Sequence, residues 1–144
     1  MFLGEHQHTL DAKGRLSLPA KFRNQLAGSV TVAKGLDNCL YVFAPADYER
    51  FMGELLAKSD FNPKVREVRR FFASGANEVD LDSAGRVSLT PSLRDWAGLA
   101  KDVVVIGSGD RIELWDAKAW ERYNGATAGD IGALSQELAD AGLL

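Results

Sequence analysis

Cysteine, histidine and long apolar segments are scarce in this chain, and each shortage excludes a class of protein. Cys39 is the single cysteine, so neither an internal disulfide nor a metal site built from thiolates can form. His6 and His8 are the two histidines, and no third ligand lies at a suitable spacing, so we expect no metal ion. No apolar run approaches the roughly 18 residues that a membrane-spanning helix requires.

Signals for export are also missing, because the first residues lack a basic segment followed by an apolar stretch. We therefore expect a cytoplasmic protein. The 144 residues include 17 Lys and Arg against 20 Asp and Glu, for a net charge of −3. This balance argues against bulk affinity for nucleic acid, although a local basic patch can still bind it. With 46% hydrophobic and 26% charged residues, the composition is that of one globular unit with a core.

Motifs for catalysis and nucleotide binding are incomplete. The segment Gly-Ser-Gly at 107–109 lacks the third glycine of a dinucleotide-binding loop and the Gly-Lys-Ser/Thr of a P-loop, so we interpret it as a hairpin loop. No motif links Cys39 to a base, and a nucleophilic role is not expected. We predict a protein that is not an enzyme and that uses no cofactor and no small-molecule substrate.

The chain contains an internal repeat. Residues 10–23 align with residues 81–94 at an offset of 71, and seven of the fourteen positions are identical. Both copies begin with the pattern Leu-Asp-x-x-Gly-Arg-x-Ser-Leu, and the seventh identity is the arginine that ends each copy, Arg23 and Arg94. Two copies separated by a spacer predict a duplicated half-domain.

Each copy predicts a strand, a tight loop and a second strand, with Gly14 and Gly85 supplying a positive φ at the loop tips. The β-branched runs at 30–33 and 103–106 predict buried strands. Their partners are expected in the apolar segments that follow each run: 40–43 and 112–115.

The spacer between the copies has helical periodicity. Apolar residues from Tyr48 to Leu56 recur at i, i+3, i+4, i+7 and i+8, which predicts an amphipathic helix that begins near Pro45. Asn62 followed by Pro63 predicts the start of a second helix, and hence an αα-hairpin. The inner face of the second helix would carry three apolar residues: Val65, Val68 and Phe72.

The part after the second copy predicts less regular structure. We expect a short helix containing Trp120 and Tyr123, followed by a flexible segment at 125–132 where small residues gather. A weak final helix would contain the remaining apolar residues: Ile131, Leu134 and Leu138.

The motif Asp-x-x-Gly-Arg is the strongest candidate for a binding site. An arginine beside a glycine turn can present its planar guanidinium group outward, where it suits guanine O6 and N7 or a phosphate. We expect Asp11 and Asp82 to accept backbone N–H groups across their loops or to bind the neighbouring arginine. One copy alone would be interpreted as a solvated turn, but the second copy repeats an arginine that the turn does not need. Arg15 and Arg86 therefore suit a two-fold ligand such as duplex DNA.

Positive charge gathers around the first motif. The segment 13–23 has no acidic residue and four basic ones: Lys13, Arg15, Lys21 and Arg23. In the second copy, Ala84 and Ser92 replace the two lysines. Two basic residues remain there: Arg86 and Arg94. We expect these cations to contact DNA, with more phosphate contacts from the first copy.

Several segments together form a wider pattern: Met1-Phe2-x-Gly4, Leu10-Asp11-x-Lys13-Gly14-Arg15-Leu16-x-x-Pro19-x-x-Phe22-Arg23, Asp82-x-x-Gly85-Arg86 and Glu113-Leu114-Trp115. This pattern resembles the bacterial MraZ family of transcriptional regulators. The resemblance implies an α+β fold in which two duplicated swapped-hairpin halves, like those of AbrB and MazE-like proteins, form a double-split β-barrel with the αα-hairpin inserted. It also implies assembly into a ring and control of the division and cell-wall gene cluster, including the protein's own promoter.

The resemblance further implies roles for single residues. Arg15 and Arg86 would be the primary DNA contacts. The loops would be ordered by an acid and a glycine in each copy: Asp11, Gly14, Asp82 and Gly85. Lys13 matches the first motif, whereas Ala84 departs from any basic requirement in the second. We therefore expect the two loops to contact DNA unequally.

The predicted division of the chain has four parts. These are a first repeat at 5–47, a helical hairpin at 48–75, a second repeat at 76–119, and a C-terminal helix and tail at 120–144. The sequence thus predicts a sequence-specific DNA-binding regulator that acts as a homo-oligomer on repeated promoter boxes in double-stranded DNA, in the cytoplasm and associated with the nucleoid. The alternative is a protein-interaction module of the same fold, such as an antitoxin, whose C-terminal arm would fold on its partner.

Overall fold

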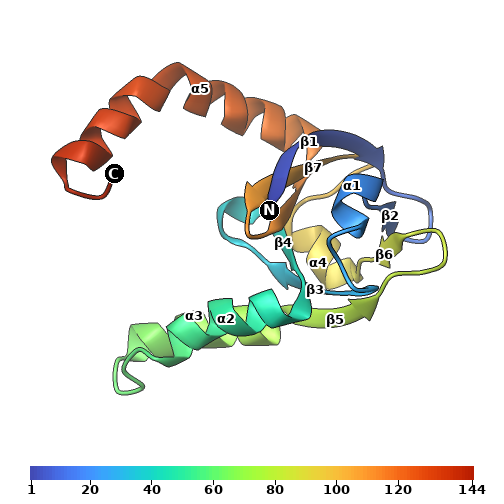
Figure 1. Ribbon diagram of the computed structural model, residues 1–144, viewed down its shortest axis with the longest axis horizontal. Coiled ribbons are helices and arrows are strands. Elements are labelled where there is room, and N and C mark those ends of the chain that lie inside the picture. Colours follow the sequence, from blue (N-terminus) through green and yellow to red (C-terminus); the bar gives the residue numbers. More distant parts are fainter.

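Strands of the two repeats are interleaved in one antiparallel sheet, shown in the computed structural model of residues 1–144 (Figure 1). The sheet has six strands in the order β1-β7-β8-β4-β3-β5. Their bounds are β1 Phe2–Thr9, β3 Ser29–Lys34, β4 Leu40–Phe43, β5 Ala76–Asp80, β7 Asp102–Gly109 and β8 Ile112–Asp116. Both predicted pairs of apolar strands, β3 with β4 and β7 with β8, are confirmed, as is the α+β class.

A separate ribbon of two short strands connects the repeats. β2 (Arg15–Ser17) pairs antiparallel with β6 (Arg86–Ser88). The strand, loop and strand predicted in each copy are present, but the strands beside a loop do not pair with each other. β1 pairs with β7 in the large sheet, whereas β2 pairs with β6. The two repeats therefore depend on each other for their hydrogen-bonded partners.

The main core lies between the six-stranded sheet and the ribbon. Leu16 of β2 and Val87 of β6 are fully buried, and they belong to the same apolar cluster as the inward-facing residues of β3, β4, β7 and β8. The short helices α1 (Ala20–Arg23) and α4 (Pro91–Trp96) follow the ribbon strands and add Phe22 and Leu93. Burial of each such side chain contributes about 1.5–3 kcal/mol, so the ribbon is held against the sheet.

The predicted αα-hairpin is confirmed as α2 (Pro45–Leu56) and α3 (Pro63–Ser74). Asn62 caps α3 by accepting the backbone N–H of Lys64 at 3.0 Å. The Tyr48 hydroxyl donates to the carbonyl oxygen of Phe72 at 2.6 Å, inside a second apolar cluster on the opposite face of the sheet from the main core. The expected inner position of Val68 is wrong, because this side chain is 43% exposed and borders an open apolar groove beside Trp96.

The C-terminal part is one continuous helix, α5 (Ala117–Asp140). The expected flexible segment at 125–132 is therefore wrong. Each glycine costs a helix about 1 kcal/mol relative to alanine, but this segment contains no proline and includes two alanines, the residue with the highest helix propensity. The Asp116 side chain caps the helix by accepting the backbone N–H of Ala119 at 3.2 Å. Figure 1 shows the far end of α5 and the α2–α3 hairpin on the side of the molecule away from the ribbon.

The interpretation of 107–109 as a hairpin loop is also wrong. Gly107 lies inside β7, opposite Gly4 of β1 and Ile112 of β8. A Cβ at Gly107 would lie 2.6 Å from the Cα of Leu3, so glycine is present there because the strands approach closely and not because the chain turns. None of the helices is both long and apolar enough to cross a membrane.

Candidate nucleic-acid interface

The first loop, residues 10–14, is ordered by Asp11. Its Oδ1 accepts the backbone N–H groups of Lys13 and Arg15, both at 2.9 Å, and its Oδ2 accepts Nε of Arg15 at 2.8 Å. Gly14 at the tip has φ of 74°, a conformation that favours glycine. The two roles that the sequence left open for the aspartate, backbone acceptor and arginine partner, thus occur together.

The second loop, residues 81–85, repeats this geometry. Asp82 Oδ1 accepts the backbone N–H groups of Ala84 and Arg86, both at 2.9 Å, and Oδ2 accepts Nε of Arg86 at 2.7 Å. Gly85 has φ of 73°. In both loops, hydrogen bonds from the arginine's backbone N–H and from its guanidinium group lower the pKa of the aspartate below the ordinary value. Both carboxylates are therefore charged at neutral pH.

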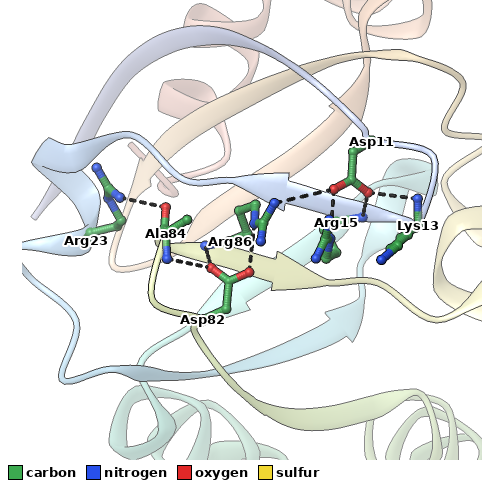
Figure 2. A network of polar contacts seen from close by, with 7 residues as sticks. All are labelled: Asp11, Lys13, Arg15, Arg23, Asp82, Ala84 and Arg86. Atoms are coloured by element: carbon green, nitrogen blue, oxygen red, sulfur yellow. Dashed lines mark hydrogen bonds and ion pairs between the residues drawn. The ribbon is translucent and has the colours of Figure 1, made fainter.

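The ribbon places the two arginines on one face. Arg15 lies opposite Ser88, and Arg86 lies opposite Ser17. Because side chains alternate along a strand, these four residues face outward while the residue between them in each strand faces the core. The arginines are diagonal neighbours, and Asp11 Oδ2 lies 3.9 Å from Nη1 of Arg86 as well as 2.8 Å from Nε of Arg15 (Figure 2). One carboxylate therefore adjoins both guanidinium groups.

Each guanidinium group is hydrogen-bonded to its aspartate through one nitrogen, and its other nitrogens are left without a hydrogen-bond partner in the protein. The side chains of Arg15 and Arg86 are 28% and 32% exposed. Within each guanidinium group, only Nε donates a hydrogen bond to the protein. The Nη groups therefore keep their donors for a ligand. Holding Nε limits the rotamers of the side chain, whose freedom is worth about 2 kcal/mol in a flexible arginine.

The other predicted cations fall into two groups. The lysines, Lys13 in the first loop and Lys21 on α1, are exposed and take part in no ion pair. Arg23 and Arg94 are instead half-buried against the loops of the opposite repeats. Nη1 of Arg23 donates to the carbonyl oxygen of Ala84 at 3.1 Å (Figure 2).

Two outward-facing serines belong to the same surface and were not assigned from the sequence. Ser17 and Ser88 lie between the arginines on the ribbon face. The signal that could have found them is their identity at equivalent positions of the two copies. A hydroxyl can donate or accept a hydrogen bond with a phosphate or a base edge, so the serines extend the polar surface between the guanidinium groups.

The residues considered for other chemistry lie in segments outside the β2–β6 ribbon. His6 and His8 are neighbours on β1, as expected, and burial together with the charges of His6 and Arg23 lowers the pKa of His8. Cys39 is buried, and burial raises the pKa of its thiol. No group of three or more His, Cys, Asp and Glu side chains could hold a metal ion.

Comparisons with known proteins agree with the motif pattern. The family model described as "MraZ protein, putative antitoxin-like" matches residues 1–71 and 72–130, one match for each half of the chain. A transcriptional regulator MraZ from Syntrophomonas wolfei is 40% identical over 143 residues, which are 99% of this chain and 100% of that protein. The transcriptional regulator MraZ of Saccharopolyspora erythraea is 48% identical over 124 residues, 85% of this chain and 86% of that protein. The resemblance found in the sequence is thus confirmed, and the chain belongs to the MraZ family.

Proposed function

We propose that this protein is a sequence-specific DNA-binding transcriptional regulator whose β2–β6 ribbon enters the major groove. The relatives are named transcriptional regulators. The major groove is wide enough for a two-stranded antiparallel ribbon. The ribbon exposes two arginines and two serines on a single face.

The single observation that carries this proposal is the fixed orientation of Arg15 and Arg86. A guanidinium group recognises guanine through O6 and N7, or bridges a phosphate, by two parallel N–H donors. The aspartates hold Nε at 2.8 Å and 2.7 Å and leave the terminal nitrogens for such a contact. The side chains are therefore ordered before DNA arrives, which reduces the entropy lost on binding. Lys13 and Lys21, both exposed beside the ribbon, neutralise flanking phosphates.

In this proposal, the repeats at 5–47 and 76–119 close into one split barrel. β1 and β5 are the two edges of the six-stranded sheet, and each leads through one of the loops into a ribbon strand. The ribbon thus spans the two edges and covers the core. Leu18 N–H donates to the carbonyl of Gly85 at 3.2 Å, and Leu89 N–H donates to that of Gly14 at 2.9 Å, which supports the closure.

We further propose that the protein assembles into a ring through its helices. Apolar side chains of α5 are exposed: Tyr123, Ile131, Leu134 and Leu138. Figure 1 places the end of α5 and the α2–α3 hairpin away from the ribbon, so contacts between copies through these helices would leave the loops free. Several ribbons on one rim would bind repeated promoter boxes by avidity. The affinity gained in this way would compensate for the repulsion between DNA and a chain whose net charge is −3. The boxes would lie before the division and cell-wall gene cluster, including the protein's own gene, and the protein would act in the nucleoid without catalysis.

Fluorescence anisotropy on a duplex from upstream of the protein's own gene, and on a scrambled duplex of equal length, tests this function. Wild-type protein should bind the native duplex more tightly, and Arg15→Gln should remove most of the difference. Lys58→Gln is the charge-matched control, because Lys58 is exposed in the turn between α2 and α3, outside the ribbon and α5. Equal binding of the two duplexes by the wild type would refute the proposal and favour a protein partner.

A further inference from the structure

We propose that Arg23 and Arg94 are positioning residues, each of which holds the DNA-binding loop of the opposite repeat, and that they do not bind phosphate. This inference rests on the proposed function for its DNA-binding consequences. It replaces the role that charge alone predicts for these two arginines. Each repeat would then need one arginine of the other repeat to order its own binding loop.

Arg23 lies on α1 of the first repeat, directly against the second loop. Its Nη1 donates to the carbonyl oxygen of Ala84 at 3.1 Å. A Cβ at Gly85 would overlap Nη1 and Cδ of Arg23 and would lie 2.8 Å from its Cζ. The guanidinium group therefore packs against the backbone at the loop tip, where only glycine leaves room for it. Figure 2 shows Arg23 reaching Ala84 from outside the second loop.

Arg94 occupies the equivalent place on α4 of the second repeat, against the first loop. A Cβ at Gly14 would lie 3.0 Å from Cζ and 3.1 Å from Nε of Arg94. Nε of Arg94 is buried and has no hydrogen-bond partner. The Nε side of the guanidinium group therefore faces the loop tip. The arginine contributes packing against the loop tip where Arg23 also contributes a hydrogen bond.

Backbone hydrogen bonds join the two repeats at the same two loop tips. The carbonyl of Gly85 accepts from the N–H of Leu18, and the carbonyl of Gly14 accepts from the N–H of Leu89. Leu18 precedes α1, which carries Arg23, and Leu89 precedes α4. Each loop tip is thus held from one side by a strand end and from another by an arginine, both of which belong to the other repeat.

This arrangement has a definite consequence for the arginines that face DNA. The second loop ends at Arg86, so the orientation of Arg86 depends on Arg23 of the first repeat. The orientation of Arg15 depends in the same way on Arg94. Because Arg23 makes a hydrogen bond that Arg94 lacks, the second loop loses more when its arginine is replaced.

Hydrogen–deuterium exchange of the free, full-length protein tests the first part without DNA. Arg23→Gln should speed exchange of the amides of Ala84, Gly85 and Arg86, which are hydrogen-bonded within the second loop, and should leave the first loop unchanged. Lys21→Gln, on the same short helix, is the control and should change neither loop. Unchanged exchange in the second loop of Arg23→Gln would overturn the proposal.

Binding to the native duplex tests the second part through a double-mutant cycle. Arg23→Gln combined with Arg86→Gln should bind no more weakly than Arg86→Gln alone, whereas Arg23→Gln combined with Arg15→Gln should lose affinity multiplicatively. Arg23→Lys keeps the charge but lacks the planar group, so it should bind as weakly as Arg23→Gln. Rescue by lysine, or multiplicative losses in both combinations, would contradict the positioning role.

The salt dependence of binding separates positioning from phosphate contact. Each phosphate contact adds about 0.9 to the magnitude of the negative slope of log K against log salt concentration on B-form DNA. Lys21→Gln should reduce this magnitude by about one such contact, whereas Arg23→Gln should reduce it no more than Arg86→Gln does. A larger reduction for Arg23→Gln than for Arg86→Gln would overturn the inference. If the wild type does not discriminate the native duplex, the proposed function fails, while the exchange experiment still decides the positioning role.

Discussion

Replacing Gly85 with alanine tests how strongly the loop tip is constrained. Alanine in the left-handed conformation costs roughly 1–2 kcal/mol, and Gly85 has φ of 73°. The new Cβ would also displace the guanidinium group of Arg23. Loss of its hydrogen bond to Ala84, which is largely solvent-exposed, adds about 1 kcal/mol, below the usual range for charged donors. We expect Gly85→Ala to lower the free energy of unfolding by about 2–3 kcal/mol.

Gly28→Ala provides the matched comparison. Gly28 has φ of 85°, and a Cβ there would meet no atom within 4 Å, so only the conformational cost of about 1–2 kcal/mol applies. Urea unfolding measures both variants, at one protein concentration because assembly shifts the apparent stability. Gly85→Ala should be the less stable variant by about 1 kcal/mol. Equal destabilisation of the two variants would refute the contact between Arg23 and the loop tip.

Three further expectations follow from the loops and from α5. Asp11→Asn should weaken DNA binding, although it removes a negative charge near a polyanion. The loss should be larger than for Asp82→Asn, because only Asp11 adjoins both arginines. Tighter binding by Asp11→Asn in an anisotropy titration would contradict the ordering role. Hydrogen bonds from the neighbouring arginines hold the pKa values of Asp11 and Asp82 below the ordinary aspartate value in the folded protein. Their contribution to stability is therefore present above that ordinary value and is lost as the pH falls through the lower, folded values. Urea unfolding from pH 6 down to pH 2 should show this loss for the wild type and a flatter profile for the double asparagine variant. Leu134→Asp, in the exposed apolar stripe of α5, should reduce the mass of the assembly in light scattering while circular dichroism stays unchanged, and an unaltered mass would exclude this part of α5 from the subunit contact.

Local features of the loops were predictable from the sequence because they depend on residues close together in the chain. Two residues suffice to define each loop. These are an aspartate, which accepts the backbone N–H groups of the second and fourth residues after it, and a glycine at the tip. The family followed from the same motifs. The strands at 30–33 and 103–106 were predictable because β-branched runs favour buried strands.

Other features depend on contacts between distant segments. β2 has three residues and finds its partner in β6, which belongs to the second repeat, and so short a strand carries no signal of its pairing. Gly107 suggested a turn, but the close approach of Leu3 requires a glycine inside a strand. The positioning contact of Arg23 with Ala84 spans 61 positions, so its charge alone suggested a phosphate ligand.

Methylation interference on the native duplex tests the central claim most directly. Dimethyl sulfate methylates guanine at N7 in the major groove and adenine at N3 in the minor groove, two positions that the grooves present separately. Methylation at N7 of a few guanines should block binding by the wild type. Arg15→Gln should lose the interference at one subset of these guanines, and Arg86→Gln should lose it at the two-fold related subset. Interference confined to adenine N3, or the same pattern for the wild type and both variants, would contradict recognition of the major groove by the ribbon arginines.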